Sequence, residues 1–222
     1  MAKKKKAVCL LSGGLDSATA AYEARRQGYD VYCLTIDYGQ RHKRELRSAR
    51  TVARCVATQH RVVRVTLPWG GSALTDRGIA VPLDRKIARE TKAIPATYVP
   101  SRNIIFLSLA CSWAEVLGAQ AVFIGANQLD YSGYPDCRDT FLRAFERTVR
   151  CGTKAGIERK TLKIKAPLIR LDKQGIIKRA VRLGVPIEKT WSCYQGGKKP
   201  CGRCDACLLR ARGFKAAGIV PV

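Results

Sequence analysis

Residues 7–17 read AVCLLSGGLDS, where a short apolar run passes into a Ser-Gly-Gly turn and then into a helical pattern. The apolar run is typical of a buried strand, and residues 17–27 have the length of a helix that ends at Gly28. Two glycines at such a junction allow a tight turn whose backbone N–H groups point outward, at the positive end of the helix. The hydroxyls of Ser12 and Ser17 add two donors. The segment therefore predicts a loop that binds pyrophosphate.

This glycine loop, residues 12–17, differs from the two common phosphate-binding patterns. No lysine follows its glycines, as one does in the P-loop, and the Gly-x-Gly-x-x-Gly pattern of dinucleotide-binding folds is absent. An ordinary turn between strand and helix is the alternative, but it leaves both serines and Asp16 unexplained. We therefore keep the phosphate-binding interpretation.

Strand and helix patterns alternate through most of the chain. Short apolar or alternating segments predict further strands over residues 31–36, 60–65, 121–124 and 162–165. Apolar residues at helical spacing predict further helices over residues 43–58, 103–117, 138–151 and 173–183. This alternation predicts an α/β fold, an open parallel sheet with helices on both faces. We expect a main domain over residues 1–185 and a small C-terminal element over residues 186–222.

The composition argues against membrane and secreted classes of protein. The chain has 222 residues, 46% of them apolar, which suits one substantial core. Its longest apolar runs are far shorter than the roughly 18 to 20 residues that cross a bilayer, and the lysines at 3–6 precede too short an apolar stretch for a secretory signal. Six of the ten cysteines are scattered, mostly through apolar segments, as small core residues are. We expect a cytoplasmic protein.

The net charge is strongly positive. Lys and Arg number 41 against 17 Asp and Glu, which gives +24 at pH 7, and the excess is largest over residues 138–222. An anionic partner is therefore expected. Nucleic acid, a nucleotide with several phosphates, and a compositional preference for arginine on solvated faces all remain open.

Four cysteines gather near the C-terminus, at Cys193, Cys201, Cys204 and Cys207, with Gly and Pro between them. Four thiolates at this spacing can close a tetrahedron around Zn²⁺, at about 2.3 Å per sulfur. An iron–sulfur cluster is the alternative, but Ala211 stands where a ferredoxin-like run would have its last cysteine. Because four protein ligands leave no open position, we expect a structural zinc site.

A third motif, residues 130–138 with the sequence DYSGYPDCR, follows the predicted strand at 121–124. In an open parallel sheet, ligands bind beyond the carboxyl ends of the strands. This motif, residues 37–42 and the glycine loop should therefore face one crevice. Its tyrosines and carboxylates suit a flat heterocycle with a guanine-like edge, while a turn with surface aromatics is the alternative.

The glycine loop resembles the PP-loop of the ATP pyrophosphatase superfamily, whose adenine nucleotide alpha hydrolase-like members cleave ATP between the α and β phosphates and adenylate an oxygen. Five motifs, in order along the chain, resemble the 7-cyano-7-deazaguanine synthase family of queuosine biosynthesis. They are residues 12–17, 37–42 (DYGQRH), 97–103 (TYVPSRN), 130–138 and the four terminal cysteines.

The resemblance implies a carbon–nitrogen ligase that converts 7-carboxy-7-deazaguanine and ammonia, with two ATP, into the nitrile through adenylated acid and amide intermediates. It assigns ATP to Leu11, Ser12, Gly13, Gly14, Leu15, Asp16 and Ser17, the deazaguanine to Arg102, Asn103, Asp130, Tyr131 and Asp136, and one zinc ion to the four cysteines. We expect Asp16 to hold magnesium on the departing pyrophosphate, with a helix N-cap as its alternative role. The other catalytic candidates, which would neutralise that pyrophosphate, are Arg41, His42 and Arg102. His42 and Asp136 are options for a general base that the sequence does not decide.

Two other functions would use the same features: that of a second class of enzyme and that of a nucleic-acid-binding module. A tRNA-thiolating PP-loop enzyme would suit the basic C-terminal third, but it needs an additional RNA-binding domain. A nucleic-acid module displaying Lys198, Lys199 and Arg203 leaves the glycine loop unexplained. Small-molecule partners are therefore expected rather than nucleic acid or a membrane, and the apolar residues 218–222 leave a homodimer open.

One residue departs from the family pattern. Ser101 stands where most relatives are expected to have glycine. If that position has positive φ, serine there costs roughly 1 kcal/mol.

Overall fold

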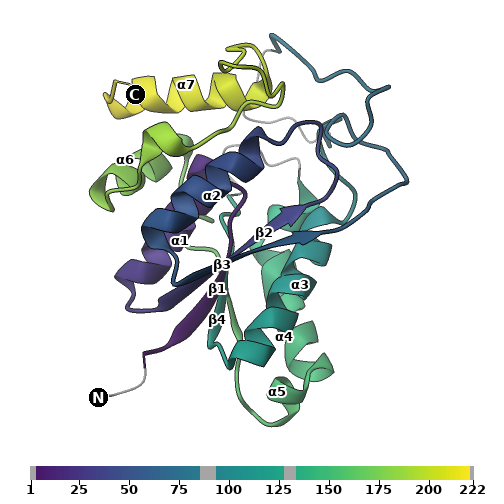
Figure 1. The fold of residues 1–222 in the computed structure, drawn as a ribbon, viewed down its shortest axis with the longest axis vertical. Coiled ribbons are helices and arrows are strands. Elements are labelled where there is room, and N and C mark those ends of the chain that lie inside the picture. The colour runs from purple at the N-terminus through teal and green to yellow at the C-terminus, as the bar shows by residue number, and fades with distance from the viewer. Residues whose placement is uncertain (1–3, 86–93, 128–133, 221–222) are drawn as a thin grey trace.

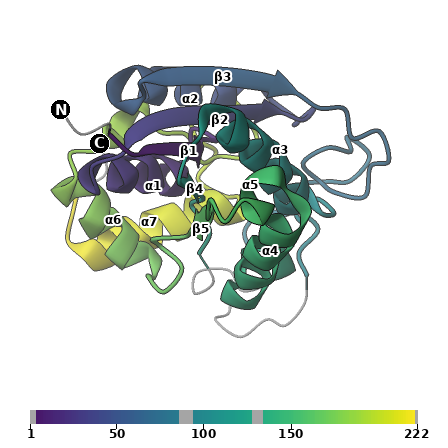
Figure 2. The same ribbon diagram turned by 90° about the horizontal axis from the view of Figure 1, so that it is seen from below.

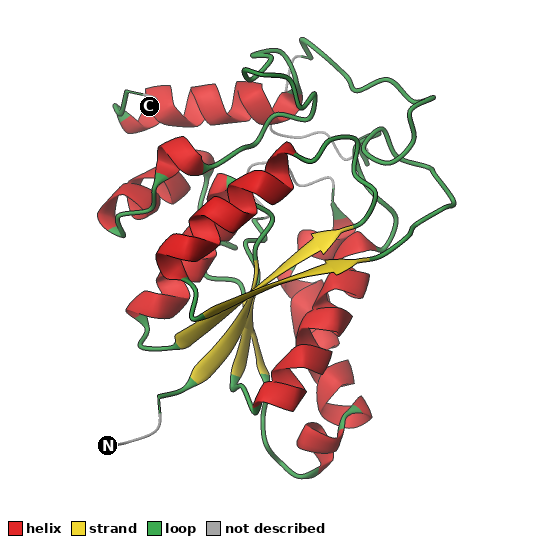
Figure 3. Ribbon diagram, viewed as in Figure 1, coloured by secondary structure: helices red, strands yellow, loops and turns green. Residues whose placement is uncertain are grey.

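A computed structural model of the chain describes residues 4–85, 94–127 and 134–220 (Figure 1). Its centre is a sheet of five parallel strands in the order β3-β2-β1-β4-β5. The strands are β1 (Lys6–Leu10), β2 (Asp30–Asp37), β3 (Gln59–Arg64), β4 (Ala121–Phe123) and β5 (Lys163–Lys165). The strands fan out with the usual twist of a parallel sheet (Figure 3). The predicted open parallel sheet is confirmed.

The helices follow the predicted alternation. They are α1 (Leu15–Arg26), α2 (Arg44–Val56), α3 (Arg102–Leu117), α4 (Asp139–Gly152), α5 (Lys154–Ile157), α6 (Lys173–Arg182) and α7 (Asp205–Ala217). Short 3₁₀ turns occupy η1 (Pro135–Cys137) and η2 (Ile187–Lys189). The predicted strands and long helices lie within two residues of the observed ones, whereas α5, η1 and η2 were not predicted. Among the residues described, no helix is long and apolar enough to span a bilayer.

Two hydrophobic cores lie on opposite faces of the sheet. Ala7 and Cys9 of β1 point into the core beneath α1, α2, α6 and α7, whereas Val8 and Leu10 point into the core beneath α3 and α4. Figure 2 shows these two helical layers on either side of the strands. Because β1 is buried on both faces, it reads as a continuous apolar run rather than as an alternating one.

The C-terminal helix α7 is part of the main core. It packs on α6 at Gly213, where a Cβ would lie 2.8 Å from Ile177 Cδ1. Phe214 is 1% exposed and belongs to the same core as Ile177. Residues on both sides of the boundary predicted between residues 185 and 186 therefore pack in one core. The division into two parts stays a prediction.

Ser101 has the left-handed backbone conformation, with positive φ, that was considered for this position in the sequence analysis. Its φ is 55° and its ψ is 16°, and its side chain makes no capping hydrogen bond at the start of α3. We predict that Ser101→Gly raises the free energy of unfolding by about 1 kcal/mol, because glycine adopts this conformation without a Cβ clash. Urea unfolding of the two proteins measures the difference. Equal or lower stability of the variant would contradict the strain at this position.

Candidate active site

A cavity of about 320 Å³ opens at the carboxyl ends of the central strands. Leu11 after β1, Ile36 of β2 and Ile124 after β4 line its floor. The chain leaves β1 toward β2 on one side, while β4 pairs with β1 on the other. The cavity therefore lies at the switch point of the sheet, where open α/β folds bind their ligands.

The glycine loop forms one wall of this cavity and is held tightly by its neighbours. Gly13 has φ +90°, and a Cβ there would lie 2.6 Å from the Ala49 nitrogen of α2. The Gly13 carbonyl accepts hydrogen bonds from the Trp191 N–H at 2.9 Å and from Ser48 Oγ at 3.1 Å. Only glycine fits this position, because the φ is positive and no room exists for a side chain.

The two serines of the loop bond to each other and to its backbone. Ser12 Oγ lies 3.0 Å from Ser17 Oγ, which donates to the Gly14 carbonyl at 3.0 Å. Gly14 is the N-cap residue of α1, and no side chain caps this helix. The positive end of α1 therefore faces the cavity without a protein anion on its cap. Leu15, the first residue of α1, also lines the cavity.

Gly125 is a site residue that the sequence interpretation missed. A Cβ on it would lie 2.7 Å from the Ser17 nitrogen and 2.9 Å from the Asp16 carbonyl oxygen. The end of β4 therefore packs directly on the first turn of α1, which brings both to the cavity wall. The signal in the sequence was a glycine directly after a buried strand.

Asp16 is paired with a lysine from the far end of the chain. Lys173 Nζ lies 2.9 and 2.8 Å from the two oxygens of Asp16, and the two side chains are only 16% and 30% exposed. Because the N-cap is Gly14 and α1 has no side-chain cap, the helix-cap alternative for Asp16 is wrong. The pair places a carboxylate and an ammonium group beside the glycine loop.

Arg210 of α7 adds a second cation to the cavity wall. Its guanidinium donates to Thr190 Oγ1 at 2.9 Å and to the Ile187 carbonyl at 3.2 Å. Burial lowers the pKa of Arg210, and the nearby Asp16 carboxylate opposes that shift. Neither Lys173 nor Arg210 was singled out from the sequence, because each is far from the glycine loop along the chain.

Aromatic side chains line the other half of the cavity around Arg102. The Arg102 guanidinium lies 5.9 Å from the centre of the Tyr38 ring, and Tyr134 and Tyr194 complete this wall. The Tyr134 hydroxyl hydrogen-bonds Thr97 Oγ1 at 2.8 Å. Burial raises the pKa of all three tyrosines, so they are neutral phenols at physiological pH. A flat, polar ring fits between such groups.

Asn103 and Asp136 are hydrogen-bonded to each other, but only Asn103 lines the cavity. The Asp136 carboxylate accepts from the Asn103 backbone N–H at 3.1 Å, and the Asn103 side-chain amide donates to the Asp136 carbonyl at 3.3 Å. Asn103 lines the cavity, whereas Asp136 is 5% exposed and lies behind it. Asp136 thus supplies the cap that Ser101 does not. The predicted contacts of Asp130 and Tyr131 with the purine fall outside the described residues.

Arg41 and His42 lie away from the cavity wall. Arg41 Nη2 donates to the carbonyls of Asp76 at 3.0 Å and Ile79 at 2.8 Å, which fixes the loop between them. His42 packs against Gly196 in the cysteine-rich element, and burial lowers its pKa. This placement favours structural roles for both. Lys173 and Arg210, in contrast, line the cavity.

Glu45, in the first turn of α2, is an acidic residue of the cavity wall that the sequence interpretation overlooked. Burial raises its pKa from the usual 4.5 to about 7, although the positive charge of Arg102 opposes the shift. Sequence patterns do not single out this residue, because it lies in a strongly basic helix whose charged residues are typical of a solvent-exposed face.

The stability of the protein should depend on the charge of Glu45. The folded chain keeps this proton up to about pH 7, whereas the unfolded chain loses it near pH 4.5. Stability therefore falls as the pH rises between these values and stays lower above them. We predict that Glu45→Gln is more stable than the wild type at pH 8, by up to about 3 kcal/mol, and equally stable near pH 4. Urea unfolding at the two pH values measures this, and equal stability at pH 8 would contradict the burial.

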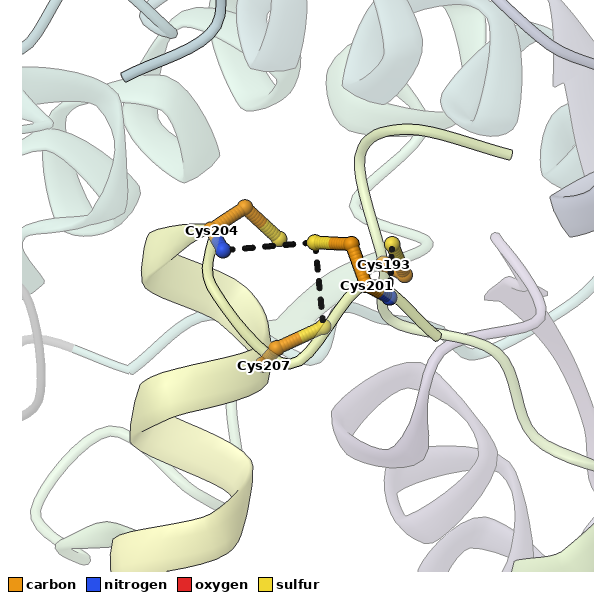
Figure 4. A group of neighbouring side chains, drawn as sticks. All are labelled: Cys193, Cys201, Cys204 and Cys207. Atoms are coloured by element: carbon orange, nitrogen blue, oxygen red, sulfur yellow. Dashed lines mark hydrogen bonds between the residues drawn. The ribbon is translucent and has the colours of Figure 1, made fainter. Parts of the chain in front are cut away.

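The four terminal cysteines form one cluster (Figure 4). Their sulfur atoms lie within 4.8 Å of one another, and Cys201 Sγ is 3.9 Å from Cys207 Sγ. That separation matches the edge of a tetrahedron whose centre is about 2.3 Å from each sulfur. The Cys201 N–H donates to Cys193 Sγ at 3.3 Å, and the Cys204 N–H donates to Cys201 Sγ at 3.3 Å. Such amide bonds stabilise thiolates, so this cluster could hold a metal ion.

The electrostatics of the cluster also suit a cation. A hydrogen bond from Cys207 lowers the pKa of Cys204 to about 5, and the same contact raises the pKa of Cys207. The two sulfurs are therefore close enough to share a proton. A divalent ion at the centre would stabilise the thiolate form of all four.

The cysteine cluster is tied to the cavity through α7 and through residues 83–85. Arg203 pairs with Asp84, and Arg85 lies 3.0 Å from Asp205 at the start of α7. From there α7 brings Leu209 and Arg210 to the cavity wall. The cluster therefore holds one side of the cavity in place without itself touching the ligand space.

A parallel sheet with a glycine loop at its switch point and a half-buried ion pair beside that loop defines an α/β protein with a ligand cavity at the carboxyl ends of its strands. The sequence identifies the family within this class. The model of the family described as Queuosine biosynthesis protein QueC matches residues 6–218. The chain belongs to this family.

Curated relatives agree along nearly the full length. A protein named 7-cyano-7-deazaguanine synthase from Anaeromyxobacter sp. (strain Fw109-5) is 56% identical over 99% of this chain and 96% of its own length. Proteins with the same name from Aromatoleum aromaticum and Trichodesmium erythraeum are 53% and 52% identical, over 99% and 96% of this chain and 97% of each relative. The chain is therefore a synthase, and a carbon–nitrogen ligase suits the names of its relatives.

Solved structures of more distant proteins also align. An NH3-dependent NAD synthetase from Campylobacter jejuni is 19% identical, with a TM-score of 0.45 over 85% of this chain and 69% of that one. A 4-thiouridine synthetase in complex with RNA and bound ATP is 20% identical, with a TM-score of 0.49 over 96% of this chain and 53% of that one.

Proposed function

We propose that this protein converts 7-carboxy-7-deazaguanine and ammonium, with two ATP, into 7-cyano-7-deazaguanine. The observation that carries the proposal is family membership over residues 6–218 together with relatives of that name at more than half identity. The cavity supports it, because a phosphate-binding loop and a tyrosine-lined pocket share one space. A nucleotide and a deazapurine can therefore meet there.

The reaction needs its substrate oxygen activated before nitrogen can replace it. The carboxylate attacks the α phosphate of ATP and forms an acyl-adenylate, and ammonia then displaces AMP to give the amide. The amide oxygen is adenylated in turn, and loss of AMP with two protons leaves the nitrile. No covalent protein nucleophile is required, so the protein acts by positioning the reactants and by neutralising charge.

Each half of the cavity has a part in this chemistry. The amides of the glycine loop and the positive end of α1 would hold the β and γ phosphates. Lys173 and Arg210 would neutralise the charge that develops on the departing pyrophosphate. Arg102, Asn103 and the tyrosine wall would hold the deazaguanine, because the ring needs both stacking surfaces and hydrogen-bonding groups.

Two metals are part of the proposal. The four cysteines would bind zinc, whose borderline-soft character and tetrahedral preference match four thiolates. Asp16 would bind magnesium on the phosphates and release its carboxylate from Lys173 as it does so. Magnesium supplies charge neutralisation to the leaving pyrophosphate.

Partners and setting follow from the same chemistry. Ten cysteines with no disulfide in the described structure suit the cytoplasm, where we place the protein. We propose small molecules as its only substrates and leave a homodimer open. The +24 charge has no role in the steps above.

Incubation of the purified protein with 7-carboxy-7-deazaguanine, ATP, magnesium and ammonium tests the proposal. Mass spectrometry should detect first the amide and then the nitrile. If the free base is not consumed while tRNA is bound in a salt-dependent way, the tRNA-modifying alternative replaces it.

A further inference from the structure

The proposed reaction consumes ammonia, but at neutral pH nearly all of it is present as ammonium. An ammonium nitrogen has no lone pair and cannot attack an acyl-adenylate. A group in the cavity that takes a proton from ammonium would raise the supply of ammonia at the reaction site, and a carboxylate with a pKa close to neutral is suited to that task. The sequence left His42 and Asp136 as options for this base, and neither lines the cavity.

Among the residues that the structure describes, three acidic ones line the cavity: Asp16, Asp205 and Glu45. Asp16 is paired with Lys173, and Asp205 is paired with Arg85 at 3.0 Å. Within residues 4–85, 94–127 and 134–220, no ion pair to Glu45 is found. Glu45 is thus the acidic group on this wall that remains available to a small cation.

The surroundings of Glu45 come from four parts of the chain. Arg102 of α3 faces it, as do Tyr38 after β2 and Tyr194 of the cysteine-rich element. On its own helix, Arg44 stacks on the Trp191 ring at 4.6 Å. The backbone of Glu45 lies against Gly13 of the glycine loop. Glu45 therefore lies where the glycine loop and the tyrosine-lined half of the cavity meet.

We propose that Glu45 binds ammonium in this cavity and accepts the proton that the nitrogen must lose before it attacks the acyl-adenylate. The inference rests on the proposed function. Burial that brings the Glu45 pKa to about 7 makes the group a stronger base than an exposed carboxylate, and it still binds a cation when ionised. Burial raises the pKa of the Tyr38 phenol, so Tyr38 carries no competing charge at this pH.

The proton and bond changes balance. Ammonium transfers one proton to the Glu45 carboxylate and becomes ammonia. Its lone pair forms the new C–N bond, the C–O bond to the adenylate breaks, and the electron pair leaves with AMP. The nitrogen loses its second proton to the phosphate of the departing AMP, and Glu45 returns its proton to water before the next turnover.

Glu45→Gln tests the proposal, because it keeps the shape of the side chain and removes the base. With acid and ATP alone, the variant should release pyrophosphate in a single turnover at a rate within about threefold of the wild type, since adenylation does not need the base. With ammonium at pH 7, amide formation should fall by roughly a hundredfold or more. Its rate should then rise with pH in proportion to free ammonia, whereas the wild-type rate rises less steeply above pH 7. Glu45→Asp should recover part of the loss.

Glu158→Gln, on the surface beside Lys160, is the matched control and should behave as the wild type. A Glu45→Gln variant with unchanged amide formation and an unchanged pH profile would overturn the proposal, as would one that loses acid adenylation as well. Failure of the wild type to adenylate the acid would instead count against the proposed function, so the two failures are distinct.

Discussion

Asp16→Asn is expected to lower the rate of pyrophosphate release by about a hundredfold or more. The carboxylate stands beside the glycine loop and is held by Lys173, and the amide cannot hold magnesium with the same charge. The fold should survive, because the side chain is 30% exposed and does not cap α1. A coupled pyrophosphate assay with saturating ATP measures the rate, and circular dichroism checks the fold.

Asp139→Asn provides the matched control for this experiment. Asp139 also lies in the first turn of a helix and pairs with a basic side chain, Arg143, at 2.8 Å, but it is not on the cavity wall. Its variant should release pyrophosphate as the wild type does. If Asp16→Asn retained that rate too, the metal-holding role of Asp16 would be removed.

Cys204→Ser is expected to lose both the metal and the activity. We expect about one zinc ion per chain in the wild type and little in the variant, because one ligand of a closed tetrahedral site is gone. The free energy of unfolding should fall by about 4 kcal/mol or more, since metal binding of this kind is part of the folding free energy. Activity should be lost as well, because α7 positions Leu209 and Arg210 on the cavity wall.

Metal analysis and thermal unfolding measure these changes, with Cys151→Ser as the control. Cys151 is exposed on α4 and is not part of the cluster. A wild-type protein with a broad visible absorption would show an iron–sulfur cluster in place of zinc. A Cys204→Ser variant with full metal content and full stability would contradict the cluster as a structural site.

The fold could be predicted from the sequence because its signals are local. A short apolar run of residues 7–11 followed by two glycines needs only neighbouring residues to be interpreted. The spacing of the four cysteines is local in the same way, and their sulfurs do converge. The glycine loop and the cysteine cluster were therefore found without any knowledge of the tertiary structure.

The missed residues depend on contacts between distant parts of the chain. Lys173 is 157 residues from Asp16, and nothing near it in the sequence marks it as a site residue. Glu45 is a charged residue in a basic helix, and only the folded chain places it half-buried on the cavity wall beside Arg102 and the tyrosines. Arg41 and His42 are the opposite case, residues that the sequence singled out but that the fold places away from the cavity wall. Both were predicted as catalytic because they are charged residues in a family motif, whereas Arg41 binds the backbone of a loop.

The phosphorus-containing products of a complete reaction test the central chemistry most directly. If the glycine loop grips the β and γ phosphates while the substrate acid captures the nucleotide, each nitrile should appear with two AMP and two pyrophosphate, as ³¹P NMR and chromatography can count. Formation of ADP and orthophosphate in their place would contradict cleavage between the α and β phosphates and, with it, the function proposed for this cavity.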